Sequence, residues 1–248
     1  MTSMKRETLT GDPIKSALLG DVVPDSEAGA CGGATKLLVQ DTAAWRLLHV
    51  AAFLLGGTTF CAGTAYLYAP ASDTTAPLWS AALYTVGSVG FLSVDVQEFF
   101  TYTADAALRT NIACSAAGSL LYVVGSLGFI PTLYAITPAP GELGFVLGSA
   151  AIGLSQAWKT ARLGWTGASF SPAKLLRDVD TATAVGVEAS AGVGAWCFFA
   201  GTVIYTVFGP APEGAWLAVV LATWCAGSAW FTIGGLFLAY RHIVMGVS

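Results

Sequence analysis

The chain has 248 residues, of which 55% are hydrophobic and only 10% charged, and its formal net charge is −4. Soluble domains carry about 25% charged residues, and disordered chains combine low hydrophobicity with high charge. The composition therefore argues against an ordinary cytosolic enzyme and excludes a disordered chain. No basic stripe is present to contact phosphates, so no nucleic-acid partner is expected. A polytopic membrane protein remains.

The first segment, residues 1–42, contains charges throughout together with several glycines and prolines. This composition is typical of a flexible tail, which we expect on the cytoplasmic side. Residues 43–248 are predicted to form a single transmembrane domain.

Six segments of that domain are apolar over roughly the 20 residues that a membrane-spanning helix needs. They lie at about 45–68, 78–101, 111–135, 143–164, 183–208 and 215–244. The connections 69–77, 136–142 and 209–214 are short and contain prolines, which end helices. The sequence therefore predicts an all-α membrane bundle of six transmembrane helices, arranged as three tandem hairpins. After the fourth span, Ser171 and Pro172 predict a short helix on the cytoplasmic surface.

The basic residues indicate the orientation of the bundle. All 11 Lys and Arg fall at the end that holds both termini, whereas the opposite turns contain only the acidic residues Asp73, Glu142 and Glu213. By the positive-inside rule, both termini are expected to face the cytoplasm. We expect a multi-pass protein of the plasma membrane or an endomembrane, with an organellar membrane as an open alternative.

A pattern of small and aromatic residues recurs along the chain. In the odd-numbered spans it has offsets of four, seven and eight residues and comprises Gly56, Phe60, Gly63 and Thr64, then Gly118, Tyr122, Gly125 and Ser126, then Gly194, Phe198, Gly201 and Thr202. The even-numbered spans share a Gly-Ser pair that begins at Gly87, Gly148 and Gly227. Small residues allow close helix packing in lipid. The pattern predicts three hairpin copies, at about 45–102, 111–165 and 183–245, with these glycines at helix contacts; the alternative is that the glycines line a passage.

The strongest copy of the pattern reads Gly-Ser-Leu-Leu-Tyr-Val-Val-Gly-Ser-Leu-Gly-Phe at 118–129 and Gly-Phe-Val-Leu-Gly-Ser-Ala at 144–150. It resembles the YrhK-like domain, a small two-helix membrane unit. The resemblance extends over 45–245 as three degenerate copies. It implies the hairpin architecture, and it carries no catalytic motif and no site residues.

Ionisable and amide side chains inside the spans gather at one depth, in the cytoplasmic third. The members of this predicted polar collar are His49, Asp95, Glu98, Gln156 and Glu188. Ionisable groups within a span are costly and point to function. Two interpretations stay open: a site for a proton or ion, or a network of ion pairs with Lys159 and Arg162 on the fourth span.

No cofactor, metal or catalytic site is expected. The five cysteines show no C-x-x-C or metal-ligand spacing, and the usual catalytic and nucleotide-binding motifs are absent. His49 and His242 lie on the first and last spans at similar depth, as a haem pair would. Their position near a wet interface is more typical of hydrogen-bonded histidines.

Two classes of function remain. One is a non-enzymatic membrane protein that passes a proton, ion or small solute through the bundle. The alternative is a structural or assembly subunit of a larger membrane complex, or a homo-oligomer, that binds partners within the lipid bilayer.

Overall fold

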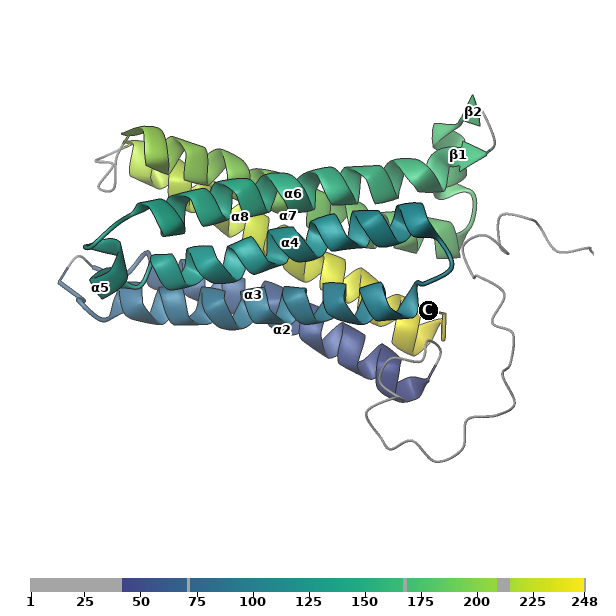
Figure 1. Ribbon diagram of the computed structural model, residues 1–248, viewed down its shortest axis with the longest axis horizontal. Coiled ribbons are helices and arrows are strands. Elements are labelled where there is room, and N and C mark those ends of the chain that lie inside the picture. Colours follow the sequence, from purple (N-terminus) through teal and green to yellow (C-terminus); the bar gives the residue numbers. More distant parts are fainter. Residues whose placement is uncertain (1–41, 71, 167–168, 209–214, 248) are drawn as a thin grey trace, which may run out of the picture.

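The computed structural model describes residues 42–70, 72–166, 169–208 and 215–247, and its long helices run side by side along one axis (Figure 1). These helices are α2 (Ala43–Tyr66), α3 (Ala76–Thr101), α4 (Ala106–Gly128), α6 (Ala139–Gly164), α7 (Val179–Phe208) and α8 (Ala215–Ala239). The prediction of an all-helical bundle is confirmed. The predicted tail, residues 1–42, lies outside the described residues except for Thr42.

Short elements occur at both ends of the bundle. Helix α5 (Pro131–Tyr134) lies between α4 and α6, and a π-helical turn, η3 (Tyr240–Val244), continues α8. After α6, strands β1 (Trp165–Thr166) and β2 (Ser169–Phe170) pair antiparallel. The predicted surface helix is a 3₁₀ helix, η2 (Pro172–Leu176), and the strand pair before it was not predicted.

The third apolar segment, predicted as one helix at 111–135, is divided. Helix α4 starts earlier because the Leu108 backbone N–H donates to the Asp105 side chain at 3.0 Å and so caps the helix. It ends at Gly128, and Pro131, which has no N–H to give to a preceding turn, begins α5. The other predicted segments agree with the helices to within four residues when η3 is counted as the end of α8.

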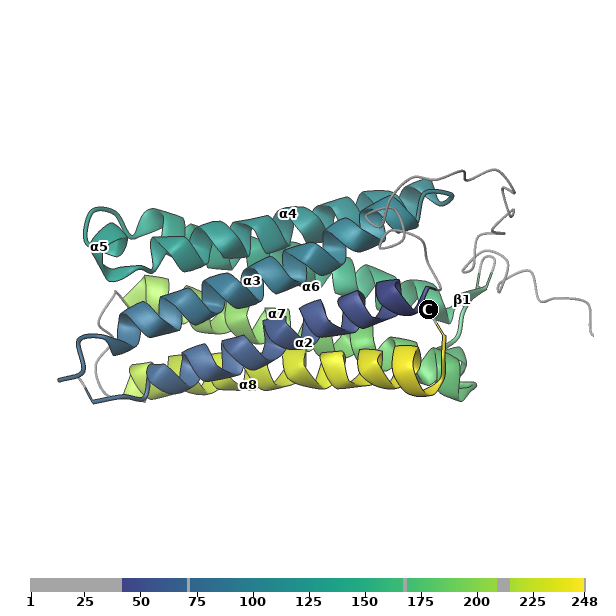
Figure 2. The same ribbon diagram turned by 90° about the horizontal axis from the view of Figure 1, so that it is seen from below.

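The long helices form a closed ring. Each packs against the next along the chain, and α8 returns to pack against α2. The most extensive contacts lie within the pairs α2/α3, α4/α6 and α7/α8. Figure 2 shows α2 beside α8, which brings the first and last helices together. The start of α2 and the C-terminal residues lie at the same end of the bundle, here called the terminal end, and α5 lies at the opposite turn end (Figure 1).

Close helix packing is concentrated at glycines. A Cβ atom added to any predicted packing glycine would lie within 3.2 Å of an atom of the other helix in its own pair; these glycines are Gly56, Gly63, Gly87, Gly118, Gly125, Gly148, Gly194, Gly201 and Gly227. In the pair α2/α3, for example, a Cβ on Gly87 would lie 2.5 Å from the Phe60 ring. In the pair α4/α6, a Cβ on Gly148 would lie 2.7 Å from the Tyr122 ring. The predicted role of these glycines in helix contact agrees with this geometry.

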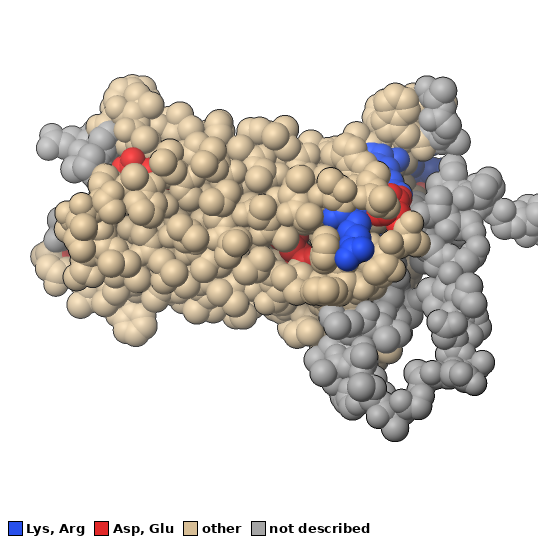
Figure 3. Space-filling view, in the orientation of Figure 1, with Lys and Arg blue, Asp and Glu red and all other residues tan. Residues whose placement is uncertain are grey.

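Within the part of the chain that the structure describes, five helices are long and apolar enough to cross a membrane: α2, α3, α4, α7 and the continuous helix Ala215–Val244. Six spans were predicted, and α6 is not among the five although it has 26 residues. Its Glu142, Lys159 and Arg162 lower its hydropathy. The face shown in Figure 3 has little charge along its length, and its Lys and Arg side chains gather at the terminal end.

Candidate functional site

All five residues of the predicted polar collar line one cavity of about 440 Å³ inside the bundle. They come from four helices: His49 from α2, Asp95 and Glu98 from α3, Gln156 from α6, and Glu188 from α7. Lys159, Arg241 and His242 line it as well, and we call this space the charged cavity. These residues lie at the same depth on helices that form a closed ring, so they meet here although they are far apart in the sequence.

Lys159 lies at the centre of the charged cavity. Its Nζ donates a hydrogen bond of 2.8 Å to Glu98 Oε2 and lies 3.9 Å from Glu188 Oε2. Its side chain is 10% exposed, and those of Glu98 and Glu188 are 13% and 21% exposed. Each carboxylate therefore has the same ammonium group as its cation. No Lys or Arg lies near Glu188 in the sequence, and the α6/α7 contact provides its basic neighbour.

Asp95 is the third buried carboxylate of the charged cavity. Its Oδ2 accepts a hydrogen bond of 2.5 Å from Ser119 Oγ of α4, and the residue is 5% exposed. With one ammonium and three carboxylates, the centre has a formal charge of −2 while the histidines are neutral. Buried charge that is not balanced is costly. The cavity therefore favours a proton or a cation.

Part of the cavity wall is apolar, and one buried amide lies beside it. Phe53, Phe91, Ile152 and Phe231 line this wall. Gln156, which is 7% exposed, also lines the cavity, and its Oε1 has no hydrogen-bond partner among the described residues. An unsatisfied buried carbonyl is costly in the absence of a donor. The amide oxygen is thus available to a donor in the cavity.

Two histidines meet at the side of the cavity. His49 Nδ1 lies 2.9 Å from His242 Nε2, and His242 Nδ1 lies 2.6 Å from the Val247 carbonyl oxygen. On its other side, His49 Nε2 lies 3.4 Å from Glu98 Oε1. The indole of Trp45 packs against both imidazoles, with centroid distances of 4.7 and 5.4 Å. The pair is buried, with His49 3% and His242 5% exposed.

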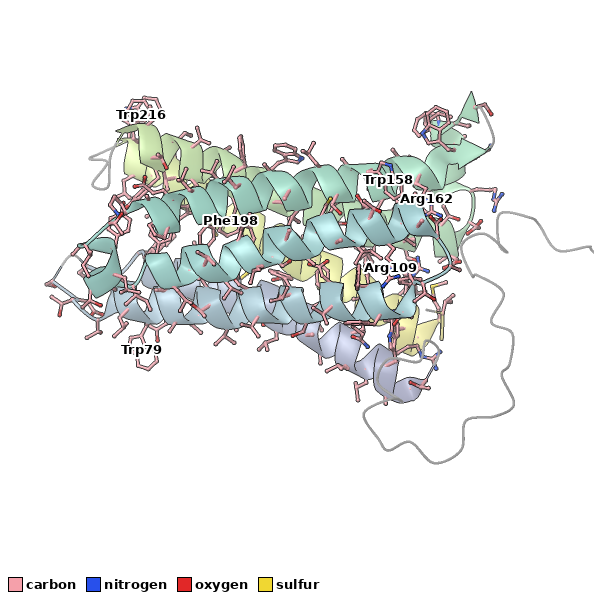
Figure 4. The ribbon with its side chains drawn as sticks, viewed as in Figure 1. Trp79, Arg109, Trp158, Arg162, Phe198 and Trp216 are labelled. Atoms are coloured by element: carbon pink, nitrogen blue, oxygen red, sulfur yellow. The ribbon has the colours of Figure 1, made fainter. Side chains whose placement is uncertain are left out.

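Ion pairs at the rim connect helices at the terminal end. Arg162 of α6 also lines the charged cavity. It pairs with Asp105, which precedes α4, and not with Asp95 or Glu98. Arg241 Nη2 lies 3.0 Å from Asp180 Oδ1. The Leu108 N–H, together with Arg162, holds the pKa of the Asp105 carboxyl below its usual range. Figure 4 shows Arg109 and Arg162 at this end of the bundle.

The same rim includes Tyr102, which directly follows α3 and lines the cavity. Burial, reinforced by the charge of Glu98, raises the pKa of its phenol. Tyr102 thus stays neutral and adds a hydroxyl group to the charged side chains of the rim.

The aromatic residues of the sequence pattern close the middle of the bundle. Phe60, Tyr122 and Phe198 lie together, with ring centroids 5.2 to 6.3 Å apart; Figure 4 shows Phe198 about midway along the bundle. Phe60 contacts Phe91, which lines the charged cavity, and Tyr84, which lines a second cavity of about 420 Å³. Rings therefore separate the two cavities, and we call Phe60, Tyr122 and Phe198 the aromatic barrier.

The second cavity lies toward the turn end. It is lined mostly by aromatic and aliphatic side chains, among them Tyr84, Phe129, Tyr134, Phe145, Tyr205 and Trp224. Its polar atoms are mainly hydroxyls, and Tyr134 donates a hydrogen bond of 2.7 Å to Glu142 Oε1. We call this space the aromatic cavity. The sequence analysis did not predict it.

The sequence placed the collar and named Lys159 and Arg162 as possible ion-pair partners of its carboxylates. Lys159 does pair with Glu98, whereas Arg162 pairs with Asp105. His242 was expected to be hydrogen-bonded, and it is, but its bond to His49 was not predicted. Its equal depth with His49 was a valid signal, and the contact between α2 and α8 was the missing fact.

Among the residues that the structure describes, no group of three or more His, Cys, Asp or Glu side chains is placed to hold a metal ion. No family model matches the chain, and no match was found among curated proteins or solved structures. The resemblance to the YrhK-like domain therefore stays a prediction.

Proposed function

We propose that the chain is a non-enzymatic, multi-pass membrane protein that takes a proton or small cation into the charged cavity and passes it across the bundle. The observation that carries the proposal is the convergence of Asp95, Glu98 and Glu188 on one internal space with Lys159. Carboxylates buried at membrane depth are expensive and are kept where a proton or ion needs them.

The proposal includes α6 as a sixth span. At 1.5 Å per residue its 26 residues extend about 39 Å, which exceeds the hydrocarbon thickness of about 30 Å. It packs between α4 and α7 within the ring. Its basic side chains point partly to acidic partners, as Lys159 does toward Glu98. Its exposed Leu143, Leu147 and Leu154 give α6 an apolar outer face that suits lipid.

The proposal also treats the three helix pairs as copies of one hairpin. Equivalent residues make equivalent contacts: Gly87 faces Phe60, Gly148 faces Tyr122, and Gly227 faces Phe198. Between pairs, Ser88 Oγ lies 3.1 Å from Ser126 Oγ, and Ser228 Oγ lies 3.0 Å from Thr64 Oγ1. These contacts support a pseudo-threefold arrangement about the aromatic barrier.

The terminal end is proposed to face the cytoplasm. The Lys and Arg side chains gather at this end in Figure 3, and exposed tryptophans occur at both ends in Figure 4, with Trp158 at one and Trp79 and Trp216 at the other. Interfacial tryptophans and cytoplasmic basic residues are the usual anchors of a membrane bundle. The charged cavity then opens toward the cytoplasm.

Passage requires a second conformation, because the aromatic barrier closes the path in this one. Phe60 and Tyr122 are both 0% exposed. Displacement of these rings would join the charged cavity to the aromatic cavity. Movement of repeated helix pairs about a central site is the usual way in which transporters alternate access.

The test is proton flux in proteoliposomes that enclose the pH dye pyranine, driven by a potassium gradient with valinomycin. Wild-type protein is expected to acidify the lumen faster than empty vesicles, and Glu188→Gln is expected to slow that rate at least tenfold. Glu142→Gln is the matched control, because Glu142 lies outside the charged cavity and contacts Tyr134.

Sodium flux under the same potential separates the two candidate ions. A rate above empty vesicles for sodium alone would identify the small cation as the species that crosses. If folded wild-type protein moves neither protons nor sodium, the proposed function is wrong.

The alternative, an assembly subunit, receives no support from the packing glycines. Each of them contacts the other helix of its own pair, so none is left to form a contact with another protein. The alternative stays a prediction, and native mass spectrometry of the complex from mild detergent tests it by its stoichiometry.

A further inference from the structure

A continuous row of polar contacts joins the C-terminal segment to the charged cavity. It runs from the Val247 carbonyl to His242 at 2.6 Å, from His242 to His49 at 2.9 Å, and from His49 to Glu98 at 3.4 Å. Arg46 Nη1 donates to the Gly246 carbonyl at 3.1 Å and holds the C-terminal segment in place. Donors and acceptors along this row can be assigned from their chemistry.

A carbonyl oxygen only accepts, so His242 Nδ1 must carry the hydrogen that it donates to Val247. A neutral imidazole has one donor and one acceptor, so His242 Nε2 is an acceptor. His49 Nδ1 must then carry the hydrogen that lies between the two rings. In a neutral His49, Nε2 would then carry no hydrogen and would present only its lone pair.

That lone pair would face a carboxylate. His49 Nε2 lies 3.4 Å from Glu98 Oε1, and the atom has no hydrogen-bond partner among the described residues. Two acceptors at this distance repel each other in a site where the His49 side chain is 4% exposed. One further proton on Nε2 converts this repulsion into an ion pair.

We propose that His49 binds this proton, so that an imidazolium paired with Glu98 forms a proton-binding site at the edge of the charged cavity. The bound proton reduces the formal charge of the cavity centre, with His49 included, from −2 to −1. The site stands on its hydrogen-bond geometry, and its use in transport rests on the proposed function.

The second imidazole gives the excess proton a route. The Nδ1–H bond of His49 breaks and an Nε2–H bond forms on His242, so the positive charge moves from one ring to the other. His49 keeps its Nε2–H and still donates toward Glu98, and His242 keeps its Nδ1–H bond to Val247. The excess positive charge thus moves from the cavity edge at His49 to His242, which contacts the C-terminal segment, without a change in the number of hydrogens on the pair.

Charged groups from every packed element surround this pair. They are Glu98 from α3, Lys159 from α6, Glu188 from α7, Arg241 beside His242, and Arg46 at the start of α2. Glu98 is the carboxylate that lies within ion-pair distance of His49 among the described residues. It is therefore the group whose removal should release the bound proton.

The chain contains only two histidines, so nitrogen NMR of the full chain labelled with ¹⁵N-histidine reports on this site alone. At neutral pH we expect three of the four ring nitrogens to carry hydrogen and one, His242 Nε2, to be bare. His242→Gln assigns the signals of His49. Two bare nitrogens in the wild-type protein would overturn the proposal.

Glu98→Gln is the decisive variant. The new amide can donate to a neutral His49 Nε2, so the number of hydrogen-bearing ring nitrogens should fall to two. Glu188→Gln, which removes a carboxylate of the same cavity that does not contact His49, should leave the number at three. An unchanged number in Glu98→Gln would show that Glu98 does not hold the proton and would overturn the proposal.

Two further measurements keep the proposal falsifiable. If Glu98→Gln does not fold, infrared detection of a protonated-carboxyl band that changes position in Glu98→Asp would place the proton on Glu98 and overturn the assignment to His49. If the wild-type protein shows three hydrogen-bearing nitrogens but no flux of protons or sodium, the proton-binding site is upheld while the proposed function fails.

Discussion

The charged cavity and the aromatic cavity have nearly the same volume, about 440 and 420 Å³, and the aromatic barrier separates them. Both have apolar walls, but their polar groups differ. The charged cavity at the terminal end contains several buried ionisable groups, whereas the aromatic cavity is lined mainly by rings, with hydroxyls as its main polar atoms. The same ring of helices thus builds one space suited to ions and one suited to apolar groups.

The two ends are also held together by different forces. At the turn end, helices α4 and α6 approach so closely that a Cβ on Gly144 would lie 2.6 Å from Gly125 Cα. At the terminal end, the ion pair of Lys159 with Glu98 connects α6 to α3 across an open space. Loss of charge should therefore damage the terminal end, whereas added volume should damage the tight glycine contacts, which include Gly144 at the turn end and Gly90 against the Ala52 carbonyl nearer the charged cavity.

The largest effect is expected from Lys159→Met. The substitution leaves Glu98 and Glu188 buried without their shared cation, and removal of one partner from a buried ion pair costs about 3–5 kcal/mol. Thermal unfolding in detergent measures the loss. Lys174→Met, on η2 outside the charged cavity, serves as the control and should lose clearly less stability, because it leaves no carboxylate of the cavity without its cation.

A compensating variant sharpens this prediction. Lys159→Met combined with Glu98→Gln and Glu188→Gln removes the unpaired charges and should recover most of the lost stability. If the triple variant recovers none of the lost stability, the Lys159 side chain stabilises the bundle by packing. Charge balance would then not be what makes the terminal end differ from the turn end.

The next largest effect is expected from Gly144→Ala at the turn end. The new methyl group would lie 2.6 to 2.8 Å from backbone atoms of Gly125 and Leu121, which cannot move without a helix shift, so a loss of about 1–3 kcal/mol is expected. Gly192→Ala is the matched control, since its Cβ would meet only the Gln156 Cβ, at 3.3 Å. Equal losses in the two variants would contradict the difference in packing between the ends.

These differences mark the limit of what the sequence could predict. Apolar segments, proline positions and the basic residues define where helices run and how deep each side chain lies, so the collar from His49 to Glu188 was found. They do not define the direction in which a side chain points around its helix. The partner of Glu188, the contact of His49 with His242 across 193 residues, and the aromatic cavity all depend on that direction.

A smaller effect is expected from Tyr84→Phe in the aromatic cavity. The Tyr84 hydroxyl lies 2.6 Å from Thr64 Oγ1, which also donates to the Phe60 carbonyl and lies near Ser228 Oγ. Thr64 keeps its other partners, so the loss should be about 1 kcal/mol in thermal unfolding. Tyr66→Phe, at an exposed tyrosine, should have no measurable effect. A loss as large as that of Lys159→Met would show that hydroxyls at the turn end are as costly to remove as charges at the terminal end.

The smallest loss of stability is expected for an exposed ion pair at the terminal end. It tests whether burial of the charges, and not their presence alone, makes that end sensitive to their removal. Asp105 and Arg162 also form an ion pair there, but their side chains are 34% and 25% exposed. Asn keeps the helix cap, so Asp105→Asn removes mainly the ion pair, which solvent screening limits to about 0.5 kcal/mol.

The pH dependence of this last variant identifies the source of the effect. The pKa of Asp105 is lowered in the folded protein, so its contribution to stability is present above the pKa of the unfolded chain, near 3.9, and is lost as pH falls through the lower folded value. The wild-type and Asp105→Asn unfolding temperatures should therefore differ slightly at pH 7 and converge in acid.

The partner of Asp105 provides the matching test. Arg162→Met should produce a similar small change in stability, and the double variant should lose little more than either single variant. A loss of stability at pH 7 as large as that of Lys159→Met would mean that solvent does not screen the ion pairs of the rim. Burial would then not explain why the ion pair of Lys159 contributes more than that of Arg162.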